Sequence, residues 1–203
     1  MNRGKLITVE GMDGAGKSSH VQWIADALRA RGHEVIETRE PGGTPLGEAL
    51  RAMLLNQSMD VETETLLMFA ARREHIVRVI EPALGAGHWV VSDRFTDATY
   101  AYQGGGRGVP TERIAELDSW VNQGLQPDLT LVFDVPVEVA RARLGRLSAG
   151  ADRFENQDAA FFDRVRRIYL ERARASSERM RIVDASGTFE DVRFQLEKDL
   201  LRV

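Results

Sequence analysis

The chain has 203 residues, of which 43% are hydrophobic and 29% are charged, a size and composition typical of one compact domain. Its net charge of −4 gives no reason to expect general attraction to nucleic acid or to a membrane surface. The absence of cysteine excludes disulfides, thiol catalysis and cysteine metal sites, and it fits a reducing compartment.

No segment has the pattern of a targeting or membrane-spanning sequence. The N-terminal stretch MNRGKLITVEG carries only a short apolar run, and no run approaches the roughly 20 residues that span a bilayer. We therefore predict a cytoplasmic protein, with no membrane partner and no nucleic-acid partner.

Short apolar runs rich in β-branched residues alternate with longer segments of helical spacing. The short runs predict strands at 6–10, 34–38, 89–93, 129–135 and 180–185. The helical spacing predicts helices at 18–32, 63–87, 111–123, 158–173 and 189–201. This alternation is typical of a parallel sheet with helices on both faces. We expect a single α/β domain over residues 1–203, in three layers around a parallel sheet of about five strands.

The segment between the first strand and the first helix, GMDGAGKS, matches the phosphate-binding pattern G-x-x-x-x-G-K-[ST]. Its glycines let backbone N–H groups converge on phosphate oxygens, and the helix that follows adds the positive end of its dipole. Lys17 is expected to reach the β- and γ-phosphates, and the Ser18 hydroxyl to ligate Mg²⁺. The predicted triphosphate site consists of Gly11, Met12, Asp13, Gly14, Ala15, Gly16, Lys17 and Ser18.

The bound triphosphate would serve as a fuel, a switch or a phosphoryl donor. A GTPase switch carries N-K-x-D near a strand end, and the lysines, which are Lys5, Lys17 and Lys198, do not form one. A D-x-x-G match at 184–187 follows the last predicted strand rather than an early one. A motor ATPase is normally longer than this chain and has an additional partner-binding domain. The donor interpretation is favoured, and it requires a second anion pocket and cations near the transferred group.

Two segments provide candidates for those requirements. At the end of the third strand, Asp93 could bind Mg²⁺ through water and Arg94 could hold an acceptor phosphate in a bidentate grip, although a strand-end ion pair would look the same. A lid at about 143–155 is suggested by arginines around small residues, with a solvated helix end as the alternative. The arginines of this region are Arg141, Arg143, Arg146 and Arg153.

Six motifs occur in an order that resembles bacterial thymidylate kinases over nearly the whole chain. They are EGMDGAGKS, TREPGGTPLGE, FAARREH, DRFTDATYAYQGGGRG, PDLTLVFDV and DRFE. The resemblance implies a P-loop NTPase-type fold with an arginine-bearing lid, and a homodimer. It also implies transfer of the γ-phosphoryl group of Mg-ATP to dTMP, giving dTDP and ADP in dTTP biosynthesis.

The same resemblance implies roles for individual residues. Asp13 would hydrogen-bond the 3′-hydroxyl of the deoxyribose, and Tyr102 would lie under the sugar. Arg94 would hold the acceptor phosphate, with Arg39 and Arg51 as weaker candidates. Phe69 would stack on thymine, and Arg72 or Arg73 would bind its O4, because helical spacing from Phe69 admits either. Thr99 and Gln103 would line the base pocket. The Glu40–Pro41 peptide is expected to be cis.

The position after Asp13 is Gly14, where one branch of the family has an arginine. The resemblance therefore implies that the lid supplies the catalytic cation, with Arg153 and then Arg146 as candidates. The helices at 62–86 and 111–123 are possible dimer interfaces. The segment 184–188 is a candidate edge of the adenine site.

Two other functions remain open from the sequence. Another small P-loop kinase would act on a different monophosphate, or on a nucleoside with Glu10 or Asp93 as the general base. A nucleotide-regulated binding module would have no acceptor at all. A metal site built on histidine is not expected, because the four histidines show no ligand spacing.

Overall fold

The computed structural model describes residues 3–147, 153–155 and 157–203. Strands and helices alternate along most of the chain, and all five predicted strands are confirmed to within one residue at either end. The elements in chain order are β1 (Leu6–Gly11), α1 (Lys17–Arg29), β2 (Val35–Arg39), α2 (Pro45–Asn56), α3 (Val61–His75), η1 (Ile76–Ile80), α4 (Glu81–Gly85), β3 (Trp89–Asp93), α5 (Thr96–Thr99), η2 (Tyr100–Gly106), α6 (Thr111–Asn122), β4 (Leu129–Asp134), α7 (Val137–Leu147), α8 (Ala159–Ala175), β5 (Met180–Asp184) and α9 (Phe189–Leu200).

The five strands form one parallel sheet in the order β2-β3-β1-β4-β5. Strand β1 lies at the centre, with Ile7 level with Val91 on one side and Leu129 on the other. Every residue of β1 is buried, which explains its continuous apolar run. The predicted α/β fold of P-loop NTPase type, with a five-stranded parallel sheet, is confirmed.

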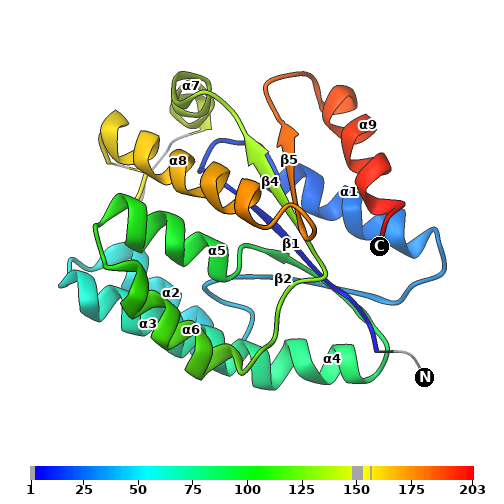
Figure 1. The fold of residues 1–203 in the computed structure, drawn as a ribbon, viewed down its shortest axis with the longest axis horizontal. Coiled ribbons are helices and arrows are strands. Elements are labelled where there is room, and N and C mark those ends of the chain that lie inside the picture. Colours follow the sequence, from blue (N-terminus) through cyan, green and yellow to red (C-terminus); the bar gives the residue numbers. More distant parts are fainter. Residues whose placement is uncertain (1–2, 148–152, 156) are drawn as a thin grey trace.

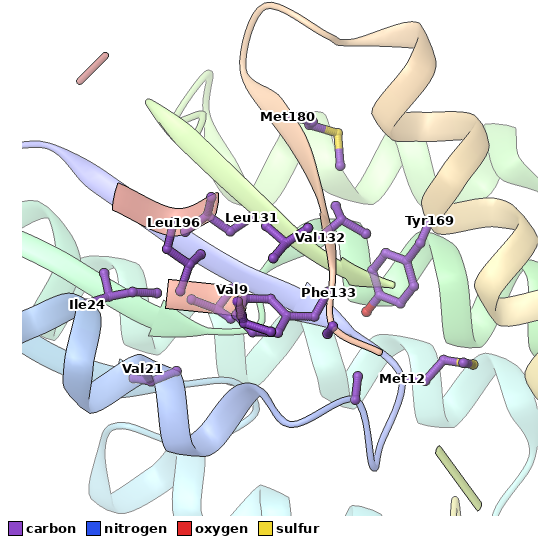
Figure 2. Packing of buried hydrophobic residues seen from close by; sticks show 14 of the residues in the cluster. Val9, Met12, Val21, Ile24, Leu131, Val132, Phe133, Tyr169, Met180 and Leu196 are labelled. Atoms are coloured by element: carbon purple, nitrogen blue, oxygen red, sulfur yellow. The ribbon is translucent and has the colours of Figure 1, made fainter. Parts of the chain in front are cut away.

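Helices cover both faces of the sheet (Figure 1). On one face α1 and α9 run side by side, and Arg31 just beyond α1 donates a hydrogen bond to the Leu200 carbonyl at 2.7 Å. Figure 2 shows side chains of both helices meeting apolar side chains of β1 and β4, namely Val21, Ile24, Leu196, Val9, Leu131 and Phe133. On the opposite face Tyr169 projects from α8 towards the sheet. No helix within the described ranges is long and apolar enough to cross a membrane.

The helix α2 was not predicted, although its start carries recognisable signals. Thr44 caps it by accepting a hydrogen bond from the Gly47 N–H at 2.9 Å, and Pro45 occupies the first helical position. The preceding Glu40–Pro41 peptide is cis, as expected. The TREPGGTP segment, which joins β2 to α2, lies at the carboxyl end of the sheet.

The glycine cluster after Gln103 belongs to a π-helical turn, η2, rather than to an open loop. A side chain at Gly105 would come within 2.5 Å of Ile168, and one at Gly106 within 2.4 Å of Phe161. Both contacts are with α8, so the small residues allow α8 to pack directly on the η2 backbone. This close approach explains why several glycines occur together.

Candidate active site

The phosphate loop joins β1 to α1 at the carboxyl edge of the sheet. Gly14 and Gly16 have φ angles of 79° and 89°, which non-glycine residues rarely adopt. A β-carbon at Gly14 would also lie 2.3 Å from the Ala140 carbonyl oxygen of α7. The loop can therefore keep this shape only with glycine at position 14.

The first turn of α1 presents its backbone N–H groups towards the loop. Gly16 is the N-cap, no side chain caps the helix, and the first turn carries no acidic residue. Lys17 is buried, and its ammonium group donates to the carbonyls of Gly11 at 3.0 Å and Met12 at 2.9 Å. Burial and the neighbouring Arg94 lower the pKa of Lys17. These donors form an anion site of the kind that binds triphosphates.

A cluster of three polar side chains lies beside the loop. Arg94 Nη2 donates to Asp13 Oδ1 at 2.5 Å and to the Tyr102 hydroxyl at 3.1 Å. The Tyr102 hydroxyl donates to Asp13 Oδ2 at 2.7 Å and accepts from the Asp13 N–H at 3.1 Å. Arg94 Nη1 donates to the Gly11 carbonyl at 3.0 Å. The loop carboxylate, the strand-end arginine and the η2 tyrosine are thus held as one unit.

The charge states of this unit follow from its contacts. Burial would raise the pKa of Asp13, but Arg94 and Lys17 outweigh it and lower that pKa to about 2. Burial and the Asp13 carboxylate raise the pKa of Tyr102 well above its usual value. Burial disfavours the charged Arg94, yet the neighbouring Asp13 raises its pKa well above the usual value. At neutral pH an ionised Asp13, a neutral Tyr102 and a charged Arg94 therefore coexist.

Two cavities adjoin at this unit. The first, called here the acceptor cavity, is lined by Asp13, Glu40, Pro41, Arg51, Leu55, Met68, Arg72, Arg94, Phe95, Ala98, Thr99, Tyr102, Gln103 and Phe154. The second, called the donor cavity, is lined by Asp13, Gly14, Gly16, Lys17, Ser18, Ser19, Arg39, Glu40, Arg51, Asp93, Arg94, Arg143, Leu144 and Glu155. Asp13 and Arg94 line both, so the two cavities share a charged boundary.

Arg72 lines the acceptor cavity and has one donor nitrogen without a partner. Its Nε donates to Glu40 Oε2 at 2.7 Å, and its Nη2 donates to the Phe95 carbonyl at 3.1 Å and to Thr99 Oγ1 at 3.0 Å. Its Nη1 is buried and has no hydrogen-bond partner. A buried donor without a partner is costly, so this nitrogen is suited to a ligand acceptor.

Of the two arginines proposed for the base, Arg72 lines the acceptor cavity and Arg73 does not. Arg73 lies in a separate hollow and donates to the Val121 carbonyl of α6 at 3.0 Å. The expectation that Phe69 faces the base is corrected by the structure. Phe69 is in the core, with the Arg72 guanidinium 4.9 Å from its ring centre, and Met68 lines the cavity instead. Neighbouring helical positions point about 100° apart, and here Met68 faces the cavity while Phe69 faces the core.

Arg39 and Arg51 both line the donor cavity, and Arg51 lines the acceptor cavity as well. Arg39 is mostly exposed and pairs with Glu48 at 2.9 Å. Arg51 donates to the Pro41 carbonyl at 2.9 Å, and burial with the neighbouring Arg39 lowers its pKa. Arg51 is therefore the better placed of the two to join Arg94 at an acceptor anion.

Asp93 and Ser18 lie in the donor cavity where a cation would be needed. Asp93 Oδ1 is buried without a hydrogen-bond partner, and the Ser18 side chain is exposed at the start of α1. In the described part of the chain, no three or more histidine, aspartate or glutamate side chains group into a metal site. A cation held here would thus depend on phosphate oxygens as well as on these two residues.

Gln103 and Arg153 meet at Glu64, a buried carboxylate of α3. Gln103 Nε2 donates to Glu64 Oε1 at 2.8 Å, and Arg153 Nη2 lies 2.7 Å from Glu64 Oε2. Arg153 also donates to the Leu54 carbonyl of α2. The expectation that Arg153 lies over the phosphates is therefore corrected. A buried carboxylate needs a cationic partner, and Arg153 supplies one next to Gln103, which lines the acceptor cavity.

Among the lid arginines whose side chains the structure describes, Arg143 of α7 lies at the phosphate loop. Its guanidinium donates to the Ala15 carbonyl at 3.5 Å and to the Ala185 carbonyl at 3.0 Å. Arg141 is exposed on the same helix, and the Arg146 side chain lies outside the described residues. Arg143 thus connects the loop with the segment 184–188, whose role at an adenine edge stays a prediction.

Glu10 is not placed to act as a general base. It is fully buried, and its two carboxylate oxygens accept hydrogen bonds from the Phe95 N–H at 2.7 Å and the Tyr169 hydroxyl at 2.8 Å. Burial and the nearby Asp97 raise its pKa to about 8. Because it lines neither cavity, Glu10 cannot reach a ligand proton.

One functional candidate was not singled out from the sequence, and two others were named without the contacts that the structure gives them. Met68 immediately precedes the FAARREH motif and was not named. Glu40 lies within the TREPGGTPLGE motif and Arg143 is one of the lid arginines, but neither was assigned a contact. Their relevance depends on which face of a helix or loop meets the cavity. That choice is made by tertiary packing.

Comparison with known proteins supports one family throughout. Residues 9–196 match the family model described as thymidylate kinase. The chain is 60% identical over 199 residues to the thymidylate kinase of Cupriavidus metallidurans, with 97% of each chain covered. It is 60% identical over 200 residues to that of Methylobacillus flagellatus, with 98% of each covered. The crystal structure of thymidylate kinase from Ehrlichia chaffeensis matches with a TM-score of 0.80 and 32% identity, over 98% of this chain and 99% of that one.

Proposed function

The chain belongs to the thymidylate kinase family, and we propose that it is an ATP-dependent kinase that transfers the γ-phosphoryl group of ATP to dTMP, giving dTDP and ADP. The observation that carries this function is the charged boundary shared by the two cavities. Arg94 and Asp13 lie between the phosphate loop and a second pocket, where a donor and an acceptor phosphate would meet.

On the donor side the chain binds and orients the triphosphate. The uncapped first turn of α1 and the loop N–H groups would surround the β-phosphate. The Lys17 ammonium would exchange its carbonyl contacts for phosphate oxygens, and Arg143 would approach the nucleotide from α7.

Mg²⁺ fits the donor cavity because Asp93 Oδ1 is a buried acceptor with no partner and Ser18 offers a hydroxyl in the same cavity. Ser18 would ligate the ion directly and Asp93 through water. When bound, Mg²⁺ neutralises charge on the phosphate oxygens.

On the acceptor side Arg94 would hold the dTMP phosphate, assisted by Arg51. Asp13 would accept a hydrogen bond from the 3′-hydroxyl, and Tyr102 would lie under the sugar. A phosphate monoester has a second pKa near 6, so the acceptor is mostly a dianion at neutral pH. Its oxygen needs positioning and charge screening rather than a general base, which agrees with the occupied oxygens of Glu10.

The base end of the acceptor cavity is suited to thymine. Arg72 Nη1 would donate to O4. Thr99 and Gln103 line the same pocket, and the flat faces of the base would contact Met68 and Phe95. A base with an amino group at that position would place donor against donor.

We further propose a cytoplasmic homodimer. A hollow formed by α2, α3 and α6 is lined by large apolar side chains that are more than half exposed, namely Leu46, Leu66 and Trp120. Apolar patches of this kind are typical of protein interfaces, and a second copy of the chain would cover this one.

The test of the proposed function is ADP release from Mg-ATP with dTMP, dUMP, dCMP, dGMP, AMP or thymidine as the acceptor. A strong preference for dTMP is expected. Preference for thymidine would indicate a nucleoside kinase, and turnover unchanged by every acceptor would indicate a nucleotide-regulated binding module.

A further inference from the structure

A chain of buried polar contacts lies behind Arg72. Thr38 Oγ1 and His75 Nε2 are 2.6 Å apart, and His75 Nδ1 is 2.9 Å from Glu40 Oε1. The other oxygen of Glu40 accepts from Arg72 Nε at 2.7 Å. The chain therefore runs from the edge strand β2, through the end of α3, to the base end of the acceptor cavity.

The residues of this chain of contacts are buried, so an unpaired polar group among them would be costly. His75 is 0% exposed, Arg72 3% and Glu40 4%. Burial alone would raise the pKa of Glu40, but the Arg72 guanidinium and the His75 ring outweigh it and lower that pKa. The ionised carboxylate thus holds His75 with one oxygen and Arg72 with the other, and the loss of either partner would leave a buried acceptor unpaired.

The planar guanidinium of Arg72 can point in only one way while these contacts persist. Glu40 holds its Nε, and the Phe95 carbonyl and Thr99 Oγ1 hold its Nη2. Nη1 is the nitrogen left without a partner beside the cavity. The orientation of the free donor therefore depends on the position of the Glu40 carboxylate.

We propose that His75 is a positioning residue for base selection, which fixes the Glu40 carboxylate and through it the direction of the free Arg72 donor. The proposal rests on the proposed function and deepens it. A guanidinium has only donors, so a fixed Nη1 selects a carbonyl oxygen and rejects an amino group. A guanidinium released from this restraint can turn and accommodate both.

The loop that carries Glu40 is packed onto the same contact. A β-carbon at Gly43 would lie 2.6 Å from both His75 Nε2 and Thr38 Oγ1, and Gly43 has a φ angle of +76°. The backbone thus closes over the histidine–threonine pair. His75 therefore supports Glu40 from a site that lines neither cavity.

The experiment compares four variants in the full chain: His75→Asn, His75→Gln, His75→Leu and Thr38→Val. Asparagine places its amide nitrogen near the former Nδ1 and can still donate to Glu40, whereas glutamine reaches the Nε2 position and leucine offers no donor. Calorimetric Kd values for dTMP and dCMP are measured beside kcat and KM for dTMP at saturating Mg-ATP. His33→Leu is the matched control, because His33 stacks on Trp89 and lines neither cavity.

For His75→Gln and His75→Leu we expect KM for dTMP to rise about tenfold and the preference for dTMP over dCMP to fall by about the same factor, with a smaller change in kcat. His75→Asn should restore most of the preference, and His33→Leu should match the parent chain. Thermal melts establish that each variant is folded. If His75→Leu fails to fold, His75→Gln and Thr38→Val provide the test. Thr38→Val is expected to lose part of the preference for dTMP over dCMP.

A folded His75→Gln variant with the parental KM and the parental dTMP-to-dCMP ratio would overturn the inference and leave the proposed function intact. Loss of kcat without loss of the ratio would assign His75 a merely structural role and also overturn it. A parent chain that phosphorylates no monophosphate would overturn the proposed function itself, and the inference with it.

Discussion

Asp13 and Arg94 form an ion pair, with Arg94 Nη2 2.5 Å from Asp13 Oδ1, at the border between the two cavities. Arg94 is also bound by the Gly11 carbonyl and by the hydroxyls of Tyr102 and Tyr169. Its charge is therefore fixed in place before any ligand arrives. Preorganised charge of this kind contributes to catalysis because it requires no reorganisation during the reaction.

Replacing Arg94 by lysine tests this arrangement. Lysine keeps the charge but loses the planar fork that can bind Asp13 and a phosphate together. We expect kcat/KM for dTMP to fall about 100-fold or more, with KM for ATP close to the parental value. Steady-state kinetics with Arg113→Lys as the control provides the measurement, because Arg113 is exposed, pairs with Glu116 and lines neither cavity. A change of only a few-fold in Arg94→Lys would count against the assigned role.

The paired variants Arg72→Lys and Arg73→Lys test which arginine binds the base. Only Arg72 has a free donor beside the acceptor cavity, whereas Arg73 donates to α6. We expect Arg72→Lys to lower kcat/KM for dTMP by about 10- to 150-fold, the value of one hydrogen bond to a charged group. Arg73→Lys should retain the parental value. The reverse pattern would move the base to the other side of α3.

The strands were predictable because a buried parallel strand is a nearly continuous apolar run. LITVE and WVVSD have this pattern, and they form the centre of the sheet as β1 and β3. The helix α2 was not recognised because TREPGGTP reads as a loop, although Thr44 and Pro45 are ordinary start signals. Local patterns thus identified helices with a long apolar face better than α2, in which only Gly47 and Leu54 are buried.

The part of the site that a sequence motif specifies through its backbone was predictable. The orientation of individual side chains was less predictable. The phosphate loop lies as predicted between a strand and a helix. Met68 and Phe69 are neighbours in a helix, and only the packing of α3 on the sheet decides that Met68 faces the cavity. Arg143 and Arg153 both belong to the lid segment, but their contacts differ. Arg143 contacts the phosphate loop, whereas Arg153 pairs with the buried Glu64 and does not line the donor cavity.

The placement of the lid arginines predicts different kinetic effects for two alanine variants. Arg143 contacts the Ala15 carbonyl in the loop, so Arg143→Ala should raise KM for ATP about tenfold, as expected for one lost charge-assisted hydrogen bond. Arg153→Ala should raise KM for dTMP instead, because it removes the nearer of the two arginines that pair with Glu64, which also holds Gln103. Initial rates over both substrates separate the two. A loss of kcat confined to Arg153→Ala would restore that residue as the catalytic cation.

The buried Glu10 predicts how stability changes with pH. Its pKa is raised from 4.5 to about 8 by burial and by Asp97, so the native chain binds this proton in a range where the unfolded chain has lost it. The stabilisation that this group contributes is therefore fully present below about pH 4.5 and is lost as the pH rises through 8. Glu10→Gln, which mimics the protonated form, should remove this dependence.

Thermal melts of the parent chain and Glu10→Gln between pH 5 and 9 provide the measurement. Each pKa unit corresponds to about 1.4 kcal/mol, or about 3 to 5 °C in Tm for a chain of this size. The Tm of the parent should therefore fall relative to Glu10→Gln as the pH rises. If the plots of Tm against pH for the parent chain and Glu10→Gln were parallel from pH 5 to 9, Glu10 would have to titrate below pH 5.

The apolar hollow formed by α2, α3 and α6 is the proposed dimer interface, so a charge placed in it should separate the subunits. Trp120 is 73% exposed there, and a tryptophan at the centre of an interface often contributes 2 kcal/mol or more, which is about 30-fold in Kd. Trp120→Glu would place a charge against apolar groups of the second copy, so we expect the parent chain to sediment as a dimer and the variant as a monomer. Leu201→Glu is the matched control, because Leu201 is 75% exposed but lies outside the hollow. A parent chain that sediments as a monomer at micromolar concentration would overturn the proposed dimer.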